Sequence, residues 1–219
     1  MARTAVSHPV FARVFERASA RMDDAGGTAH RRRLVRGLSG RIVEVGAGNG
    51  RNFAHYPAQV TEVLAVEPER RLRASGQRAA DAAPVAVTVV DGVAEELPVE
   101  DGSVDAVVMS WVLCSVASQR TALAEAYRVL RPGGQLRFFE HVVAAHPGPL
   151  RWVQRAVDAT IWPVLCGGCH ASRDTVSAIH AAGFEISSLD RFRFPDSPLA
   201  LVGPHVLGAA VRPVAEPAR

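Results

Sequence analysis

The sequence RIVEVGAGNG occupies residues 41–50, and EVLAVEP follows at residues 62–68. Two short apolar runs, separated by one segment of helix length, predict a strand, a glycine-rich turn, a helix and a second strand. This is the pattern of a nucleotide-binding βαβ unit. The glycines let the chain turn sharply and leave no Cβ to block a ligand above the turn. Glu67 ends the second run about twenty residues beyond Gly46, where a carboxylate can bind ribose hydroxyls.

The glycine spacing bears on which nucleotide binds. A dinucleotide site favours G-x-G-x-x-G, so that a pyrophosphate can lie on the helix N-terminus. Here the third glycine is Gly50, and Arg51 takes the dinucleotide position. Glu44 would repel a pyrophosphate but suits the positively charged end of S-adenosylmethionine (SAM). The turn alone favours SAM, and it leaves open a dinucleotide or a packing turn with no ligand.

Length and composition indicate one globular α/β domain. The chain has 219 residues, of which 48% are hydrophobic and 21% charged, and no linker-like stretch divides it. We expect a single domain over residues 1–219: N-terminal helices or a lid (1–39), a cofactor-binding core (40–141), and an acceptor-side insert with a C-terminal hairpin (142–219). The oligomeric state is left open.

The charge pattern argues against a nucleic-acid partner. All 25 basic residues are arginines, and the net charge is +3. Arg31-Arg32-Arg33 is the only basic run, and no aromatic residues interleave with it as base stacking would require. We interpret this run as a solvated helix face.

The first residues contain no apolar run long enough for a signal peptide or a membrane span. We therefore expect a cytoplasmic protein without a transmembrane segment; peripheral membrane contact stays open. The three cysteines do not indicate a disulfide framework. Cys166-Gly-Gly-Cys169-His170 resembles a haem-attachment or metal-binding pattern, but no second C-x-x-C accompanies it. We expect coincidence or packing there and predict no metal, and we interpret Cys114 as a small buried apolar residue.

An amphipathic helix is predicted from His8 to Met22. It could dock on the domain, form a lid over the ligand or lie on a membrane surface. After a turn at 23–27, Thr28 is expected to cap a second helix that runs to Leu38.

The rest of the chain alternates between helical and strand patterns. We expect helices at 69–83, 119–130 and 149–163, and one more between Ser172, its expected cap, and Gly183. The apolar run 85–90 predicts a buried parallel strand, and further strands are expected at 104–109 and 136–140. Residues 184–194 and 205–212 are separated by a loop alone, so they should pair antiparallel.

Several of these patterns together resemble one family. The motifs are Glu44-x-Gly-x-Gly-x-Gly, Glu67, Ala94-Glu95-Glu96-Leu97-Pro98, Asp101-Gly102-Ser103-Val104-Asp105 and Leu130-Arg131-Pro132-Gly133-Gly134. In this order and spacing they resemble the class I SAM-dependent methyltransferases of methyltransferase type 11, over about residues 40–141. A narrower resemblance is to the group that includes the mammalian alkyl-thiol methyltransferases. It is carried by Asn52-Phe53, Tyr56-Pro57, residues 112–116, Phe139-Glu140-His141, Trp162, Gly168-Cys169 and Arg173.

The resemblance implies a Rossmann-like sheet of seven strands with the last strand reversed, helices on both faces, and SAM as cofactor. It places the methionine part of SAM over the glycine turn, the ribose at Glu67, adenine at the loop 92–94 and the methyl donor near Ser110 and Trp111. The expected cofactor-binding residues are Glu44, Gly46, Ala47, Gly48, Gly50, Asn52, Glu67, Pro68, Gly92, Val93, Ala94, Ser110 and Trp111. Val93 stands where family members often have Asp, which leaves backbone contacts to adenine. The mammalian relatives begin with a hydrophobic membrane anchor, and we expect none in this chain.

Methyl transfer from a sulfonium is an in-line displacement, so positioning is the main task of the enzyme. A thiol acceptor ionises near pH ~8.5 and needs little help, whereas a phenol or quinol would benefit from a general base. His141, which follows the strand at 136–140, is our candidate base, and Asp158 and His170 are weaker candidates. We therefore expect a methyltransferase acting on a small thiol, phenol or quinol. A SAM-binding protein without activity and an NAD-dependent oxidoreductase are the alternatives.

Overall fold

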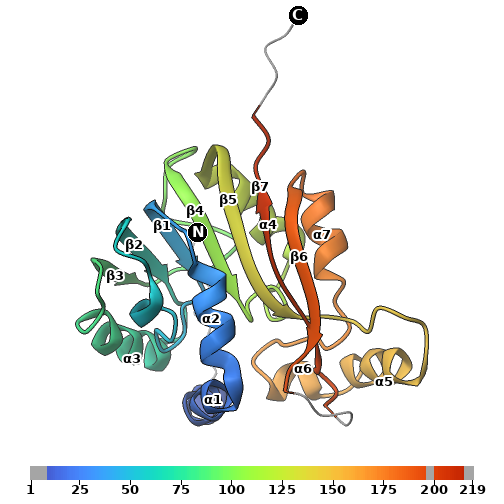
Figure 1. The fold of residues 1–219 in the computed structure, drawn as a ribbon. Helices are drawn as coiled ribbons and strands as arrows, with labels where there is room; N and C mark the ends of the chain where they lie inside the picture. Colours follow the sequence, from blue (N-terminus) through green and yellow to red (C-terminus); the bar gives the residue numbers. More distant parts are fainter. Residues whose placement is uncertain (1–8, 196–199, 215–219) are drawn as a thin grey trace, which may run out of the picture.

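The computed structural model describes residues 9–195 and 200–214. Within them lies one sheet of seven strands in the order β3-β2-β1-β4-β5-β7-β6 (Figure 1). Its strands are β1 (Gly40–Val45), β2 (Val60–Val66), β3 (Val87–Val90), β4 (Val104–Ser110), β5 (Leu130–His141), β6 (Glu185–Arg193) and β7 (Pro204–Val211). β1 to β5 are parallel, and β7 runs antiparallel to both β5 and β6. The predicted α/β class and C-terminal antiparallel pair are confirmed.

Helices cover both faces of this sheet. They are α1 (Pro9–Met22), α2 (Thr28–Val35), α3 (Arg70–Ala80), α4 (Gln119–Val129), α5 (Pro149–Asp158), α6 (Trp162–Leu165) and α7 (Thr175–Ala181), with a π-helical turn η1 (Asp23–Gly27) and a 3₁₀ turn η2 (Phe53–His55). One core cluster joins the sheet to α2 and α3, and the other joins it to α4 and α7. None of the helices in the described residues is long and apolar enough to cross a bilayer.

The run at 85–90 forms a parallel strand, but it is not a buried one. β3 covers only Val87–Val90, and its side chains are half-buried or exposed. The reason is its place in the sheet, because β3 is the edge strand and has a neighbour, β2, on one side. An apolar run does not distinguish a central strand from an edge strand.

The helix predicted between the glycine turn and β2 is wrong. Only the 3₁₀ turn η2 forms there, and Tyr56 after it is extended, with ψ of 133°. Tyr56 precedes Pro57, and a residue before proline is disfavoured in the helical region. Phe53 and Tyr56 are both buried under the turn, so this segment packs as a tight loop.

Several helix boundaries also differ from the prediction. α1, η1 and α2 follow one another almost without a break, with a kink at Gly26, where φ is 108°. α2 ends at Val35, and the expected cap by Thr28 is absent there, since the Thr28 hydroxyl donates to the carbonyl of Asp23 instead. α7 is capped by Asp174, whose carboxylate accepts from the amide of Ser177.

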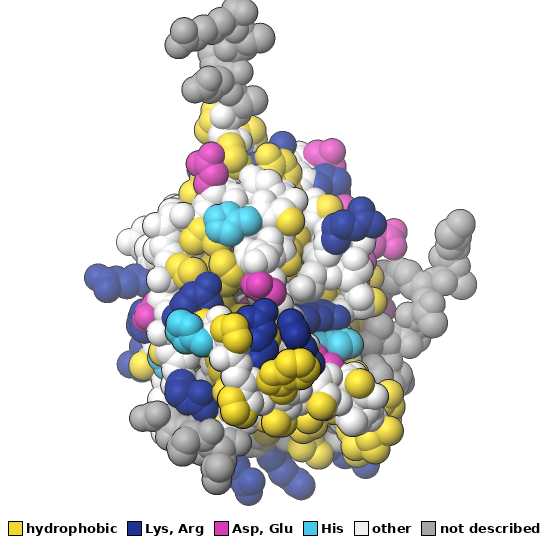
Figure 2. Space-filling model, turned by 90° about the vertical axis from the view of Figure 1, so that its right-hand side faces the viewer, with side chains coloured by type: hydrophobic (Ala, Val, Ile, Leu, Met, Phe, Trp, Pro, Cys, Tyr) yellow, Lys and Arg dark blue, Asp and Glu magenta, His cyan; other side chains and the backbone are white. Residues whose placement is uncertain are grey.

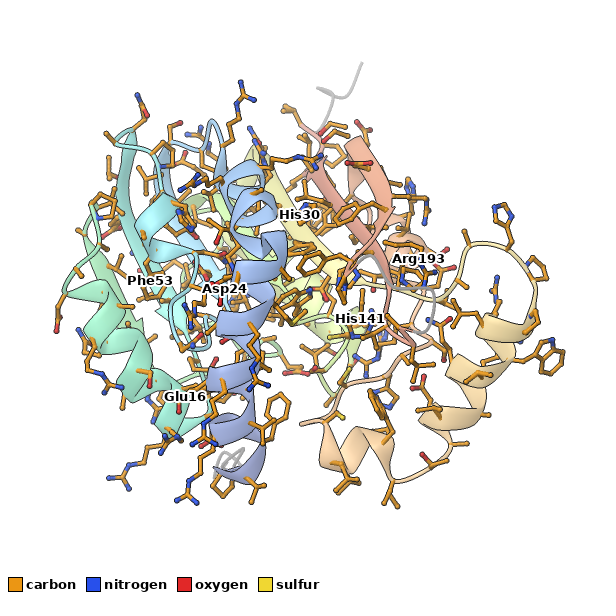
Figure 3. The ribbon with its side chains drawn as sticks, turned by 60° about the horizontal axis from the view of Figure 1, so that its bottom comes forward. Glu16, Asp24, His30, Phe53, His141 and Arg193 are labelled. Atoms are coloured by element: carbon orange, nitrogen blue, oxygen red, sulfur yellow. The ribbon has the colours of Figure 1, made fainter. Side chains whose placement is uncertain are left out.

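The carboxyl ends of the parallel strands meet at the lower edge of the sheet in Figure 1, and α1, α5 and α6 lie beside that edge. α1 attaches to α3 through polar contacts: Glu16 accepts hydrogen bonds from Ser75 and Arg71 at 2.5 and 2.8 Å (Figure 3). Val10 and Val14 remain exposed, so α1 docks without burying its whole apolar face. His8 and the rest of residues 1–8 lie outside the described residues.

Candidate functional site

The glycine turn after β1 presents bare backbone to the carboxyl edge of the sheet. Gly46 and Gly48 have φ of 60° and 58°, in the left-handed region that favours glycine. A Cβ on Gly46 would lie 2.5 Å from Val112, and one on Gly48 would lie 3.3 Å from Phe15. Gly50 serves packing instead, because its Cβ would lie 2.7 Å from both Ala79 and Phe53.

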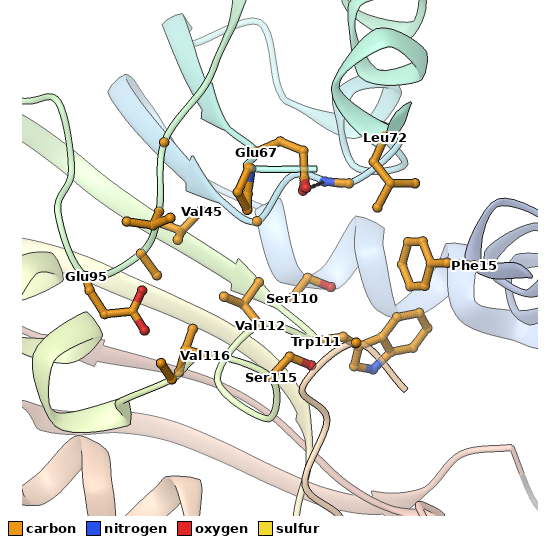
Figure 4. A pocket seen from close by; sticks show the side chains of 18 of the residues that line it. Phe15, Val45, Glu67, Leu72, Glu95, Ser110, Trp111, Val112, Ser115 and Val116 are labelled. Carbon is orange, nitrogen blue, oxygen red and sulfur yellow. Dashed lines mark hydrogen bonds between the residues drawn. The ribbon is translucent and has the colours of Figure 1, made fainter. Parts of the chain in front are cut away.

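A cavity of about 220 Å³ lies over this turn (Figure 4). Its walls come from the turn, the ends of β2 and β4, the loops that follow β3 and β4, and α1. Nine of the predicted cofactor residues line it: Gly46, Gly48, Glu67, Pro68, Gly92, Val93, Ala94, Ser110 and Trp111. Glu44, Ala47 and Asn52 line a small adjoining cavity of about 20 Å³, and Gly50 lines neither of the two.

Glu67 lies at the end of β2 with both carboxylate oxygens engaged. One accepts a hydrogen bond from the amide of Gly48 at 2.7 Å (Figure 4), and the other accepts one from the amide of Glu69 at 2.8 Å. Burial raises the pKa of Glu67 to about 7, although these two hydrogen bonds oppose the shift. The carboxylate therefore connects the glycine turn to the start of α3 and still borders the cavity.

Glu44 lies at the centre of a buried polar chain beneath the turn. Its two oxygens accept from Asn52 at 2.9 Å and from the Tyr56 hydroxyl at 2.6 Å. The Asn52 carbonyl oxygen in turn accepts from the guanidinium of Arg31 at 3.0 Å. Burial raises the pKa of Glu44 to about 7. A positive and a negative side chain thus lie on either side of one amide, next to the smaller cavity.

Arg31 corrects the interpretation of the basic run as a solvated helix face. It is 4% exposed, donates to Asp23 at 2.7 Å and lies 5.0 Å from the centre of the Trp111 ring. Arg32 and Arg33 are exposed, as expected. The sequence did give a signal for this, because residue 31 falls on the same face of α2 as the buried Leu34 and Val35.

Ser110 and Trp111 are held in unusual states at the end of β4. The Ser110 hydroxyl is buried without a hydrogen-bond partner among the described residues, and it borders both cavities. Trp111 has a φ of 57°, which is strained for a bulky side chain. Its indole nitrogen donates to His205, and burial lowers the pKa of that histidine to about 4. Backbone strain of this kind is concentrated at functional sites.

The comparisons with known proteins agree with this geometry. Residues 43–138 match the family model for a methyltransferase domain. Human thiol S-methyltransferase TMT1A is 35% identical over 184 residues, which cover 80% of this chain and 73% of that protein. The ubiquinone/menaquinone C-methyltransferase UbiE of Dinoroseobacter shibae is 36% identical over 57% of this chain and 50% of that protein.

This chain belongs to the SAM-dependent methyltransferases. Solved structures agree on the fold: a Thermotoga maritima methyltransferase has a TM-score of 0.64 at 24% identity, covering 92% of this chain and 99% of its own. The structure of a Bacillus halodurans protein described as a methyltransferase has a TM-score of 0.69 at 16% identity, and the match covers 85% of this chain and 99% of that one. SAM is therefore its cofactor, and the bare turn, the unpartnered Ser110 hydroxyl and the paired charges of Arg31 and Glu44 fit such a ligand.

Ten residues that line the cavity of the methyltransferase lie outside the predicted cofactor set, and four of them come from helices or from the segment after α6. Phe11 and Phe15 come from α1, Leu72 from α3, and Gly167 from the segment after α6. The alternative that α1 forms a lid is the one that accounts for two aromatic rings in the wall. The apolar stripe of α1 was the sequence signal for Phe11 and Phe15, but such a stripe does not distinguish a helix that packs on a core from one that faces a ligand.

His141, the candidate base, is not among the residues that line the cavity. It is buried at the end of β5 (Figure 3), and its Nε2 lies 3.1 Å from the sulfur of Cys169. The two weaker candidates serve loop structure, since Asp158 accepts from the amides of Ala171 and Ser172, and His170 Nδ1 contacts the carbonyl of Gly168.

Cys169 and Cys114 differ in their acidity. Hydrogen bonds from Cys114 and His141 hold the pKa of the Cys169 thiol below its ordinary value, whereas contact with Cys169 and burial raise the pKa of Cys114. Glu140 lies beside them and accepts from the amides of Val112 and Leu113. Burial raises the pKa of Glu140 to about 7.

Proposed function

We propose that this methyltransferase transfers the methyl group of SAM to the sulfur of a small, apolar thiol. The observation that carries the proposal is the chemistry of the cavity wall. Its described lining residues are mainly apolar, and none of them is histidine, lysine, arginine or tyrosine. A thiol ionises near pH ~8.5 and can react without a base, whereas a phenol, with a pKa near ~10, gains more from one.

The carboxylates in the wall are engaged with the backbone. Both oxygens of Glu67 accept backbone amides, and Glu95 accepts the amide of Ser118 at 3.2 Å. The names of the relatives support the same acceptor class, since TMT1A and TMT1B are called thiol S-methyltransferases. UbiE and its relatives are named as C-methyltransferases, and they cover a smaller part of the chain.

Within the proposal, the adenosine end of SAM lies between Glu67 and the loop 92–94. The amino-acid end lies over the glycine turn, where Arg31 would attract its carboxylate and Glu44 its ammonium group. These two side chains are linked through Asn52, so they present both signs of charge at a fixed spacing. Charge-assisted contacts of this kind are stronger than neutral hydrogen bonds.

The bound cofactor supplies a methyl group that its sulfonium charge already activates. The residues of the chain then have to hold the acceptor sulfur in line and exclude water. Phe11 and Phe15 from α1, with Val112 and Val116, form apolar walls suited to that task. The sulfur–methyl bond of the product forms as the sulfonium–methyl bond breaks, and the thiol proton passes to solvent before the transfer.

Exposed apolar side chains on α5 and around α6 also support an apolar acceptor. Trp152, Ile161, Val164 and Leu165, on α5 and around α6, are each at least 65% exposed. Apolar side chains gather in the lower part of the face drawn in Figure 2, where α5 and α6 lie. Gly167, shortly after Leu165, lines the cavity itself. Exposed apolar groups that form a patch are a mark of binding surfaces.

The test is a panel of alkyl thiols, phenols and quinols of matched size, scored by release of S-adenosylhomocysteine. We expect turnover of the thiols, with pH profiles that follow the pKa of each thiol. Phe15→Ala should reduce turnover, while Val14→Ala, a neighbour that is 61% exposed, should not. Turnover of phenols or quinols alone, or one pH profile for thiols of different acidity, would refute the proposal.

A further inference from the structure

A cluster of two thiols and one imidazole lies beside the cavity. The ligand atoms of Cys114, His141 and Cys169 are all within 4.8 Å of one another. The three residues come from the turn after β4, the end of β5 and the loop between α6 and α7. Cys114 and His141 are buried, and Cys169 is partly exposed, which leaves a route of entry. We propose that they bind a single thiophilic metal ion, with Zn²⁺ as the ion that suits them best.

The spacing fits a tetrahedral site. With bonds of about 2.3 Å to sulfur and about 2.0 Å to nitrogen, Zn²⁺ holds its ligand atoms about 3.5 to 3.8 Å apart. The His141 nitrogen and Cys169 sulfur lie 3.1 Å apart, and no pair in the cluster exceeds 4.8 Å. An ion would therefore require side-chain shifts of roughly 1 Å or less.

The backbone of the Cys114 turn is fixed before any ion arrives. Glu140 accepts from the amides of residues 112 and 113 at 2.9 and 3.1 Å. Arg173 donates to the carbonyls of Leu113 and Val116 at 2.6 and 2.7 Å. Bonds of this kind fix the ligand-bearing turn in one position, as a preorganised site requires.

The loop that carries Cys169 is held against this turn. The amide of His170 donates to the Cys114 carbonyl at 2.8 Å. Gly168 has a φ of 88°, and a Cβ there would lie 2.6 Å from the carbonyl oxygen of Ser115. Only glycine permits this close approach, which brings Cys169 near Cys114 and His141.

The donor set selects the metal. Thiolates and imidazole favour Zn²⁺, whereas Mg²⁺ and Ca²⁺ require oxygen ligands. Two thiolates would neutralise the charge of Zn²⁺. Three protein ligands leave a fourth position open. Ser115 and Gly167, close in sequence to Cys114 and Cys169, line the cavity, so the ion would border it. The site does not depend on the identity of the acceptor.

This cluster is not the one that the C-x-x-C-H pattern indicates. Cys166 lies outside it, and the ring of His170 contacts the carbonyl of Gly168. Cys166 is therefore a matched control, because it belongs to the same loop and is also partly exposed. The expected absence of a metal rested on that pattern alone, and the pattern could not connect Cys169 with two residues far away in the sequence.

The experiment titrates Co²⁺ into the reduced, chelator-treated full chain. We expect one equivalent to bind, with the thiolate-to-cobalt charge-transfer and visible bands of a four-coordinate site, and Zn²⁺ to displace it. Cys169→Ser and His141→Gln should each weaken binding by more than about 100-fold, because loss of an outer-shell partner already costs 10- to 100-fold. Cys166→Ser should leave the affinity unchanged.

Three results would overturn the proposal: a wild-type chain without thiolate-to-cobalt bands, a Cys166→Ser variant that loses as much affinity as Cys169→Ser, or a Cys114–Cys169 disulfide in the chain as purified. Thiol counting on the denatured, unreduced chain detects the last of these, since Cys166 alone would react. The wild-type spectrum and the thiol count remain decisive even where a variant fails to fold.

Discussion

Gly48→Val tests where the cofactor lies. Gly48 has a φ of 58° at the cavity wall, and Gly102 has a φ of 59° in a turn where a Cβ would meet nothing within 4 Å. A side chain in the left-handed region costs about 1–2 kcal/mol at either position. For a chain of this length, 1 kcal/mol shifts the melting temperature by about 2–4 °C. We therefore expect Gly48→Val and Gly102→Val to lower the melting temperature of the ligand-free chain by similar amounts.

Their effects on SAM binding should differ. The Cβ at Gly48 would lie 3.3 Å from Phe15, so the methyl groups of valine would project into the cavity. Crowding of a packed site costs about 1–3 kcal/mol, which corresponds to about 5- to 150-fold in affinity. Calorimetric titration of both variants with SAM measures the difference. Equal SAM affinities for the two variants would show that the cofactor does not lie over the glycine turn.

Two further predictions concern the charges beneath the turn. Arg31→Gln should weaken SAM binding at least tenfold, because charged hydrogen bonds contribute about 1.5–3 kcal/mol, whereas the exposed Arg32→Gln should not; equal losses in a titration would contradict the role of Arg31. Burial raises the pKa of Glu44 from its ordinary value of 4.5 to about 7, so the folded state binds more protons than the unfolded state between these pH values. The contribution of Glu44 to stability is therefore complete below pH 4.5 and is lost as the pH rises through about 7. We therefore measure the free energy of unfolding by denaturant at about pH 5 and pH 8. Between these pH values it should fall less, or rise more, for Glu44→Gln than for wild type.

Most of the fold could be predicted, because its strands are apolar runs of regular length and turn-forming residues follow them in the sequence. The order of β1, β2 and β4 follows from the βαβ pattern and from the resemblance, and the structure agrees. The errors arise where tertiary position decides. The apolar run at β3 looks like an interior strand but lies at the edge, and the segment after the glycine turn has helix length but is broken before Pro57.

The wall of the cavity beside the glycine turn could also be predicted, because its residues are adjacent in the sequence or lie at the ends of neighbouring strands. Gly46, Gly48 and Glu67 are such residues, and all three line the cavity. Arg31 and Phe15 could not be assigned, since each belongs to a helix whose docking position no local pattern specifies. An arginine in a basic run is expected to face water, but Arg31 is buried and donates to Asp23 and Asn52.

The Cys114–His141–Cys169 cluster shows why sequence spacing fails most clearly at such sites. Its members are 27 and 28 residues apart along the chain, in segments that meet only when β5 lies beside β4 and the α6–α7 loop folds back over both. The hydrogen bond from the His170 amide to the Cys114 carbonyl, and the close approach at Gly168, hold these segments together. Rules based on residue spacing cannot predict that a Cβ at Gly168 would lie 2.6 Å from the backbone of Ser115. The chemistry of this cluster therefore depends on packing, and mutations of Gly168 should perturb it even though glycine supplies no ligand.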